Sequence, residues 1–276
     1  MSAATPGAGG VRRVGRTLLW IVTAGVFLFQ FAPVVVVVFF SFNESRSVNS
    51  FTGFSLGWYE KFFSNAAALE ATMLSIGIAF ACGVVAVIVG SLLALGMQRL
   101  SRRESAASNL LIGLVFTTPE VAMGASLLLL FSSIGFTLSP VTVLLGHVTF
   151  SLSYVVFVVR ARLNSLRLDV EEAAADLGAT RMETLRLVIL PQLWPALFVS
   201  FMLVFLLSFD DFVTSFFTSG LEAPTLPVYI YGMLRRGLTP EINVIGTLMA
   251  VIALLLGLLG CLIAARRDRA MIRILQ

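Results

Sequence analysis

Six long hydrophobic runs, separated by polar segments, set the pattern of this chain. They cover residues 17–40, 69–96, 109–133, 141–159, 196–218 and 243–265. Each run exceeds the roughly 17 apolar residues that a helix needs to cross a bilayer. None shows the ten-residue alternation of polar and apolar positions that a membrane β-barrel requires. The pattern therefore predicts an all-α integral membrane protein with six transmembrane helices.

The low content of charged residues supports a membrane protein. Only 12% of the 276 residues are charged, whereas soluble domains average about 25%. Arg12, Arg13 and Arg16 precede the first run and resemble the charged start of a signal peptide, but this run is longer than a signal's apolar region and lacks a clear cleavage site. We expect a retained first span, with an N-terminal tail over 1–16 and one membrane domain over 17–265.

Lysine and arginine are distributed unequally between the two sides of the predicted spans. Of the 19 basic residues, fifteen fall in the N-terminal tail, in the segments after the second and fourth spans, and in the C-terminal tail, 266–276. Short cytoplasmic segments of membrane proteins are enriched in Lys and Arg. Both termini, and the segment 160–195 between the fourth and fifth spans, are therefore predicted to be cytoplasmic.

The segment 160–195 contains two helix starts. Asp169 is an N-cap residue with Glu172 three positions later, and Thr180 with Glu183 forms the pattern of a capping box. Gly178 lies between them, where a helix commonly ends in a left-handed conformation. The sequence thus predicts a short helix, a bend at Gly178 and a second short helix.

These two helices are expected over about 170–177 and from 181 onward. Pro191 lacks an N–H group and is expected to disrupt the second helix near that point. By pattern alone, the first helix is either a solvated surface helix or a docking helix for a cytoplasmic partner, since Ala173 and Ala174 allow another backbone to approach closely.

The order of residues in this segment resembles the signature of ABC-importer permeases, E-A-A-x3-G-x9-I-x-L-P. This chain departs from it only at Val188, where the family prefers Ile. In that family the segment is a coupling helix that docks on the ATPase subunit, and the fold is that of a type I ABC importer. The resemblance implies coupling roles for Glu171, Glu172, Ala173, Ala174, Gly178, Leu190 and Pro191.

The chain carries no recognisable catalytic motif. A phosphate-binding Walker A loop needs a Gly-Lys pair, but the only lysine, Lys61, follows Glu60. No H-E-x-x-H, G-x-S-x-G or cysteine cluster occurs either. We expect neither an enzyme nor a metal or cofactor site on this chain, and the resemblance implies ATP and Mg on a partner ATPase.

Three carboxylates lie deep inside predicted spans. Glu120 follows Pro119 and would lie ~15 Å along the third span, whereas Asp210 and Asp211 would lie roughly 21 Å along the fifth. A bare acid in the hydrocarbon costs several kcal/mol, so each should face the bundle interior or water. They either hold neighbouring helices together or line a path for a cationic solute.

A wider resemblance extends over most of residues 28–265. The stretches "SFNESR", "TTPEVAMGASLLLLF", "GHVTFSLSYVVFVVRARL", "SFDDFVTSFFTSG" and "LPVYIYGMLRRGLTPEIN" are similar to the second permease subunit of spermidine/putrescine importers. In that family acids recur at the positions of Glu120, Asp210 and Asp211. The resemblance implies polyamine import by alternating access. Importers of iron, thiamine or opines, and a stand-alone secondary transporter, remain the alternatives.

The same resemblance implies a set of partners. It predicts a heterodimer with a homologous permease subunit, two copies of an ATP-binding subunit and an extracytoplasmic solute-binding protein. Membrane lipid is the surrounding medium and no nucleic acid is involved. The expected location is the bacterial plasma (inner) membrane, which the chain crosses several times.

Other polar and aromatic residues have weaker signals. Five aromatics near the external ends are candidates for cation–π contacts or for ordinary packing: Phe209, Phe212, Phe216, Tyr229 and Tyr231. His147, the only histidine, is expected to be a hydrogen-bonded structural residue more than a proton relay. The external segment "FSLGWYEKFF" is expected to form a short amphipathic helix, and the external loops are candidate contacts for the binding protein.

Overall fold

The computed structural model describes residues 8–46, 50–166, 169–220, 223–237 and 239–274. Within these ranges the backbone is helical apart from turns, connecting segments and one isolated β-bridge between Asn43 and Phe54. Among the described residues, five helices are long and apolar enough to cross a membrane, and one sharply bent helix pair makes a sixth. The predicted all-α membrane fold is confirmed.

The chain divides into two compact units, and the smaller comprises residues 1–62 and 238–250. Asn43 is fully buried there and organises the turn after the first helix: its Nδ2 donates to the Ser50 carbonyl at 2.9 Å, and its Oδ1 accepts from the Thr52 N–H at 3.0 Å. The expected amphipathic helix is present. The helices of this unit are α1 (Ala8–Ser41), α2 (Gly57–Ser64, which runs two residues past the unit) and the beginning of α12 (Glu241–Ile274).

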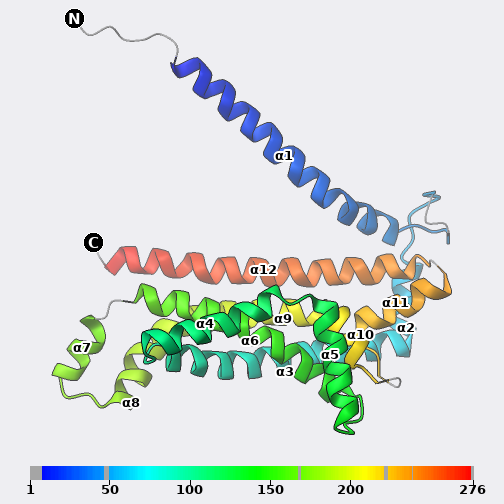
Figure 1. Ribbon diagram of the computed structural model, residues 1–276. Helices are drawn as coiled ribbons and strands as arrows, with labels where there is room; N and C mark the ends of the chain where they lie inside the picture. The colour runs from blue at the N-terminus through cyan, green and yellow to red at the C-terminus, as the bar shows by residue number, and fades with distance from the viewer. Residues whose placement is uncertain (1–7, 47–49, 167–168, 221–222, 238, 275–276) are drawn as a thin grey trace, which may run out of the picture. The chain divides into compact units, whose positions relative to one another are not determined.

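The larger unit, residues 63–237 and 251–276, contains the elements that form the candidate sites. Its core is a bundle of three long helices, α3, α6 and α9, each of which packs on the other two (Figure 1). The elements are α3 (Ala66–Met97), α4 (Arg102–Thr117), α5 (Glu120–Ser133), α6 (Pro140–Ser165), α7 (Asp169–Asp176), α8 (Arg181–Glu183), the π-helix η1 (Thr184–Ile189), α9 (Leu190–Phe209), α10 (Val213–Thr218), α11 (Leu226–Arg236) and the remainder of α12.

Small residues allow these three helices to approach closely. A Cβ added to Gly83 of α3 would lie 2.7 Å from the ring of Phe201 in α9. A Cβ added to Gly90 would lie 2.8 Å from the side chain of Val155 in α6. Helices in membranes associate through close packing because lipid offers little hydrophobic drive for it. The two glycines therefore fix the spacing of the core.

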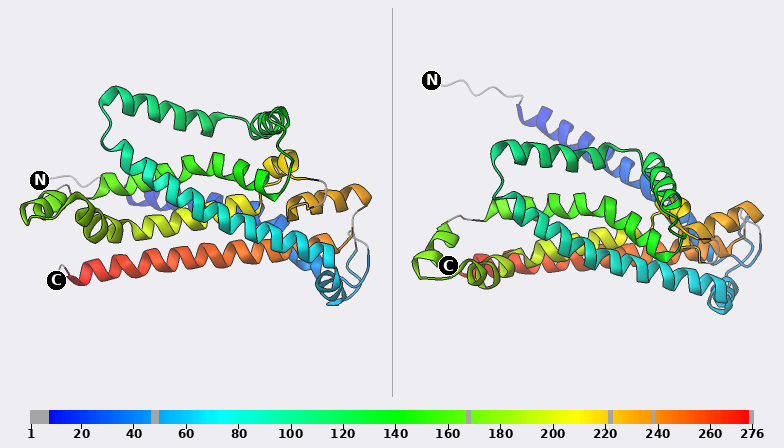
Figure 2. Two further views of the ribbon diagram at one scale, coloured as in Figure 1. Left: turned by 90° about the horizontal axis from the view of Figure 1, so that it is seen from below. Right: turned by 60° about the horizontal axis from the view of Figure 1, so that its bottom comes forward.

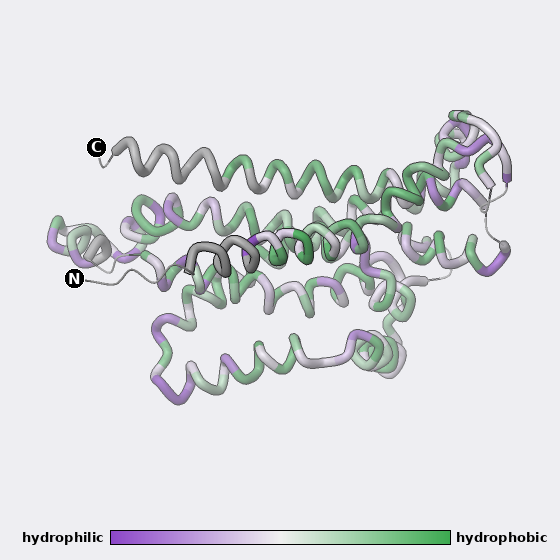
Figure 3. The backbone as a smooth tube through the Cα atoms, turned by 90° about the horizontal axis from the view of Figure 1, so that it is seen from above, coloured by the Kyte–Doolittle hydropathy of each residue, from purple (hydrophilic) through white to green (hydrophobic). Residues whose placement is uncertain are grey.

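Hydropathy follows the helices as the sequence pattern predicts. Figure 3 shows hydrophobic residues along the lengths of the helices and hydrophilic residues at their ends and in the connecting segments. Several helices continue beyond the predicted spans: α6 extends to Ser165, not 159, and α12 extends into the segment predicted as a tail. A helix satisfies its own backbone groups and can continue into water past the apolar run.

Candidate functional site

The predicted third span is broken at Glu120. Helix α4 ends at Thr117 and α5 begins at Glu120, with a bend of 102° between them (Figure 2). Thr118 has the extended backbone that a residue before proline favours (ψ 124°), and Pro119 lacks the N–H that would continue α4. The predicted span over 109–133 is therefore not one continuous helix. The distance of Glu120 along the span, which was counted for a continuous helix, does not apply past Pro119. Glu120 instead occupies the first turn of a new helix, where the helix dipole favours a carboxylate.

The predicted fifth span is also broken, at the two aspartates. Helix α9 ends at Phe209, Asp210 caps it, and α10 begins at Val213. The Oδ2 atom of Asp211 accepts a hydrogen bond of 2.8 Å from the Ser215 N–H in the first turn of α10. A continuous helix over 196–218 is thus not observed. Irregular backbone at membrane depth is tolerated where it lines a cavity or is buried in protein.

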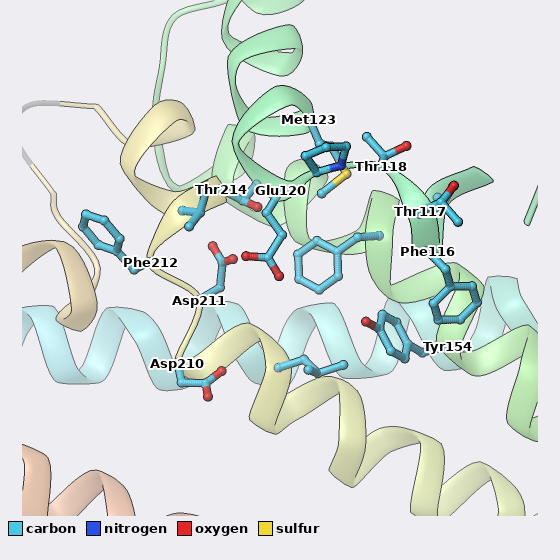
Figure 4. Close-up of a pocket in the computed structure, with 15 residues that line it drawn as sticks. Phe116, Thr117, Thr118, Glu120, Met123, Tyr154, Asp210, Asp211, Phe212 and Thr214 are labelled. Carbon is cyan, nitrogen blue, oxygen red and sulfur yellow. The ribbon is translucent and has the colours of Figure 1, made fainter. Parts of the chain in front are cut away.

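The two helix breaks meet at one cavity of about 660 Å³. Glu120, Asp210 and Asp211 all line it, and none of the described residues that line it is basic. Figure 4 shows the carboxylates of Glu120 and Asp211 pointing toward one another, with Asp210 at the end of α9. Glu120 and Asp210 are exposed in this chain, whereas only 10% of the Asp211 side chain is exposed. The structure therefore brings the three predicted acids together on one surface.

Hydroxyl groups and aromatic rings complete this cavity, which we call the acidic cavity. Thr117, Thr118 and Tyr154 contribute hydroxyls, and the Tyr154 ring packs edge-on against Phe116 with centroids 4.7 Å apart. Thr214 is fully buried, and its hydroxyl has no hydrogen-bond partner among the residues that the structure describes. These residues were not predicted, because single hydroxyls within apolar helices are common and give no distinct signal in the sequence.

The five predicted aromatics separate into different environments. Phe209 is buried, and the Tyr229 hydroxyl accepts a hydrogen bond of 3.0 Å from Asn65 Nδ2. Phe212 lines the acidic cavity and contacts Tyr231 at 4.9 Å between centroids. Phe216 also packs on Tyr231, and the Arg235 guanidinium covers that ring at 5.1 Å. Of the five, only Phe212 is among the residues that line the cavity.

His147 has the hydrogen-bonded environment that was expected. It lies on α6, is fully buried, and contacts Ser208 of α9 and Ser215 of α10. Its Nε2 atom also lies 3.1 Å from Asp211 Oδ2. Neither serine was predicted, although their spacing is a signal: Ser208 lies three residues before Asp211 and Ser215 four residues after it, as on one face of a helix.

The segment that resembles a coupling helix folds as its sequence predicts. Helix α7 spans Asp169–Asp176, and the chain then turns at Gly178 with φ +83°. The Gly178 N–H donates to the Ala175 carbonyl and the Ala179 N–H donates to the Ala174 carbonyl, which together form a Schellman motif. The Thr180 side chain and that of Glu183 form both bonds of the predicted capping box at the start of α8.

Several apolar side chains of this segment face outward. Leu177 is 89% exposed and Met182 is 55% exposed. Glu172, Ala173 and Gly178 are exposed, Ala174 is half-buried, and the Glu171 side chain lies outside the described residues. A short helix with exposed apolar residues at its end has the surface of a docking element.

Pro191 does not interrupt the second helix in the expected way. The backbone stays helical from Arg181 to Phe209, but it widens to a π-helix over Thr184–Ile189, where the Leu190 N–H donates to the Leu185 carbonyl. Pro191 occupies the first turn of α9, where a missing N–H is tolerated. Leu190 and Pro191 are exposed. π-Segments within helices are frequent at functional sites.

Comparison with known proteins identifies a family and several relatives. Residues 86–273 match the family described as "Binding-protein-dependent transport system inner membrane component". The chain is 38% identical over 243 residues to the spermidine/putrescine transport system permease protein PotC of Haemophilus influenzae, with 88% of this chain and 95% of that protein covered. It is 35% identical over 257 residues to the putrescine transport system permease protein PotI of Escherichia coli, with 91% and 92% covered.

Solved structures of low sequence identity share the fold. A chain of a bacterial ABC transporter that imports the acidic polysaccharide alginate superposes with a TM-score of 0.74 at 15% identity, covering 94% of this chain and 98% of that one. A chain of an amino acid ABC transporter superposes with a TM-score of 0.59 at 17% identity, covering 78% and 100%. The likeness extends to an alginate transporter solved in complex with a periplasmic protein.

Proposed function

This chain belongs to the family of inner membrane components of binding-protein-dependent transport systems, and we propose that, as an ABC-importer permease subunit, it conducts polyamines. One observation carries this proposal: three carboxylates from two broken helices line a cavity with no basic residue among its described lining. The names of the relatives PotC and PotI support the same cargo.

The chemistry of the acidic cavity suits a flexible polycation. An ammonium group that leaves water loses several kcal/mol of hydration unless carboxylates and hydroxyls replace it. Glu120, Asp210 and Asp211 supply the opposite charge, and the ring of Tyr154 or Phe212 can contact an ammonium or a methylene chain. A volume of about 660 Å³ lies within the range of sites for small molecules. An anionic solute would meet repulsion from all three acids.

We assign the coupling role to the segment α7–α8. Leu177 and the small residues of α7 form the surface that contacts the ATPase, and the Schellman turn at Gly178 fixes the angle of that contact. The segment lies between α6, which ends at Ser165, and the helical run that begins at Arg181. Closure of the ATPases would therefore act on two of the three core helices and reorient the acidic cavity in alternating access.

The assembly that this role requires has four kinds of component. The chain pairs with a homologous permease, and two ATP-binding subunits supply ATP and Mg on the cytoplasmic side. A solute-binding protein delivers cargo from outside. Fifteen of the 19 basic residues lie in the two tails and in the segments after the second and fourth spans, and this distribution supports cytoplasmic termini and a cytoplasmic α7–α8 segment. The external loops, which include α2 and α11, are the surfaces proposed for the binding protein.

The test is the ATPase activity of the assembled complex in lipid, with loaded binding protein. Putrescine and spermidine are titrated against iron, thiamine and an opine. Stimulation by a polyamine alone is the expected result. Stimulation by another member of the panel would keep the importer and refute the polyamine cargo, whereas solute uptake by this chain without an ATPase would refute the coupling role of α7–α8.

A further inference from the structure

His147 connects three helices at the edge of the acidic cavity. Its side chain projects from α6 into the gap between the two halves of the broken fifth span and is fully buried. Nδ1 lies 2.6 Å from Ser208 Oγ near the end of α9, and Nε2 lies 3.0 Å from Ser215 Oγ in α10. One imidazole therefore contacts both sides of the break.

The same ring contacts the acid within the break. Asp211 Oδ2 lies 3.1 Å from His147 Nε2 and accepts from the Ser215 N–H at 2.8 Å. With its hydrogen on Nε2, the imidazole can donate to this carboxylate oxygen, which only accepts hydrogen bonds. The imidazole and the Ser215 N–H thus both contact one oxygen of Asp211, and Figure 4 shows this carboxylate pointing toward that of Glu120.

Helix α10 cannot move away from α6 without breaking further contacts. A Cβ on Gly146, next to His147, would lie 2.9 Å from the Thr214 methyl group, so the two helices are in close contact there. The Thr142 hydroxyl donates to the Thr218 carbonyl at 2.7 Å. These contacts fix the position of Asp211 relative to α6. The C-terminal end of α6 precedes α7 in the chain.

We propose that His147 is a positioning residue for the solute path: it holds Asp211 across the helix break and orients its carboxylate toward the acidic cavity. This inference rests on the proposed function, because it takes Asp211 as a ligand for the cationic solute. His147 acts through Asp211 and does not contact the solute directly, since it is not among the residues that line the cavity.

A double-mutant cycle on the complete complex tests the inference. The variants are His147→Leu, Asp211→Asn and the pair, with His147→Gln as the conservative variant because its amide retains an N–H donor. The readout is the KM and maximal rate of ATP-driven uptake of labelled putrescine, or of the panel solute that stimulates the wild-type ATPase. Ser91→Ala is the matched control, because Ser91 is also buried but lies on α3, where its hydroxyl donates to the Val87 carbonyl of its own helix.

The expected result is non-additive. His147→Leu and Asp211→Asn each raise KM about tenfold, the pair is no worse than Asp211→Asn within about twofold, and His147→Gln restores most of the affinity. Ser91→Ala leaves KM unchanged. If His147→Leu fails to assemble, the cycle of His147→Gln with Asp211→Asn tests the inference instead. Any effect of the glutamine on KM must then vanish in the Asp211→Asn background.

Three outcomes overturn the inference, and the third is distinguishable from the first two. Multiplied effects in the double variant, or an unchanged KM in His147→Leu, would show that His147 does not act through Asp211, while the polyamine path stands. An unchanged KM in Asp211→Asn would remove Asp211 from the solute path, and the inference falls together with that part of the proposed function.

Discussion

The carboxylates of Glu120 and Asp211 point toward one another across the acidic cavity, although they come from two different spans (Figure 4). Each lies at a helix break: Glu120 begins α5 after the 102° bend, and Asp211 lies between α9 and α10. Like charges that face each other in a partly buried site repel. A cation between them relieves that repulsion, so the geometry favours occupancy by a positively charged solute.

Neutralising Glu120 should weaken solute binding without loss of assembly. Glu120→Gln removes one of three charges that line the acidic cavity, and we expect KM for polyamine uptake to rise about tenfold, or roughly 1.4 kcal/mol. Glu70→Gln is the matched control, because Glu70 is an exposed acid of α3 that does not line this cavity. Equal KM values for the two variants would remove Glu120 from the path.

The contact between α3 and α6 predicts a steric effect at Gly90. Gly90→Ala places a methyl group 2.8 Å from Val155, and overpacking of this kind costs about 1–3 kcal/mol. Gly77→Ala on the same helix, with nothing within 4 Å of its added Cβ, should not lower the melting temperature of the complex. Val155→Ala should restore the stability of Gly90→Ala. A Gly90→Ala complex as stable as Gly77→Ala would contradict the observed packing.

The turn after α7 depends on the left-handed backbone of Gly178. No other atom lies within 4 Å of an added Cβ, so a substitution there acts through the backbone at φ +83°. A branched residue in this conformation costs about 1–2 kcal/mol, whereas asparagine tolerates it. We expect Gly178→Val to lower ATP-driven uptake several-fold and Gly178→Asn to retain most of it. Similar uptake rates for the two variants would show that the turn geometry is not required.

Leu177 should contribute to docking of the ATPase. It is 89% exposed in this chain, and burial of a leucine in a partner's groove stabilises a complex by about 1.5–3 kcal/mol. Leu177→Asp should therefore reduce retention of the ATP-binding subunit on the purified permease, and Leu177→Met should not. Undiminished retention in the aspartate variant would place the docking surface elsewhere.

Local signals in the sequence were sufficient for the helices and for the α7–α8 segment. The apolar runs predict the spans, and the capping box of Thr180 with Glu183 and the glycine at 178 predict the shape of the α7–α8 segment, because these features act between near neighbours. All three are observed. The three acids were also identified, since carboxylates are rare in membrane spans.

The helix breaks were not predicted, for two different reasons. Pro119 was noted, but a proline within an apolar run is compatible with a kinked continuous helix, and only the structure shows the 102° bend. No Gly or Pro marks the break at Asp210–Phe212. The contacts that stabilise it come partly from another helix, through His147 and Ser208. Such tertiary contacts leave no periodic signal in the sequence.

The most direct test of the account is ATP-driven uptake of labelled putrescine and spermidine into proteoliposomes that contain the complete complex and its binding protein. The wild type is predicted to show saturable uptake that requires ATP. The double variant Glu120→Gln, Asp210→Asn should assemble normally and raise KM about a hundredfold, roughly 2.7 kcal/mol. No polyamine uptake by the wild type, or an unchanged KM in the double variant, would contradict an acid-lined path for polyamines.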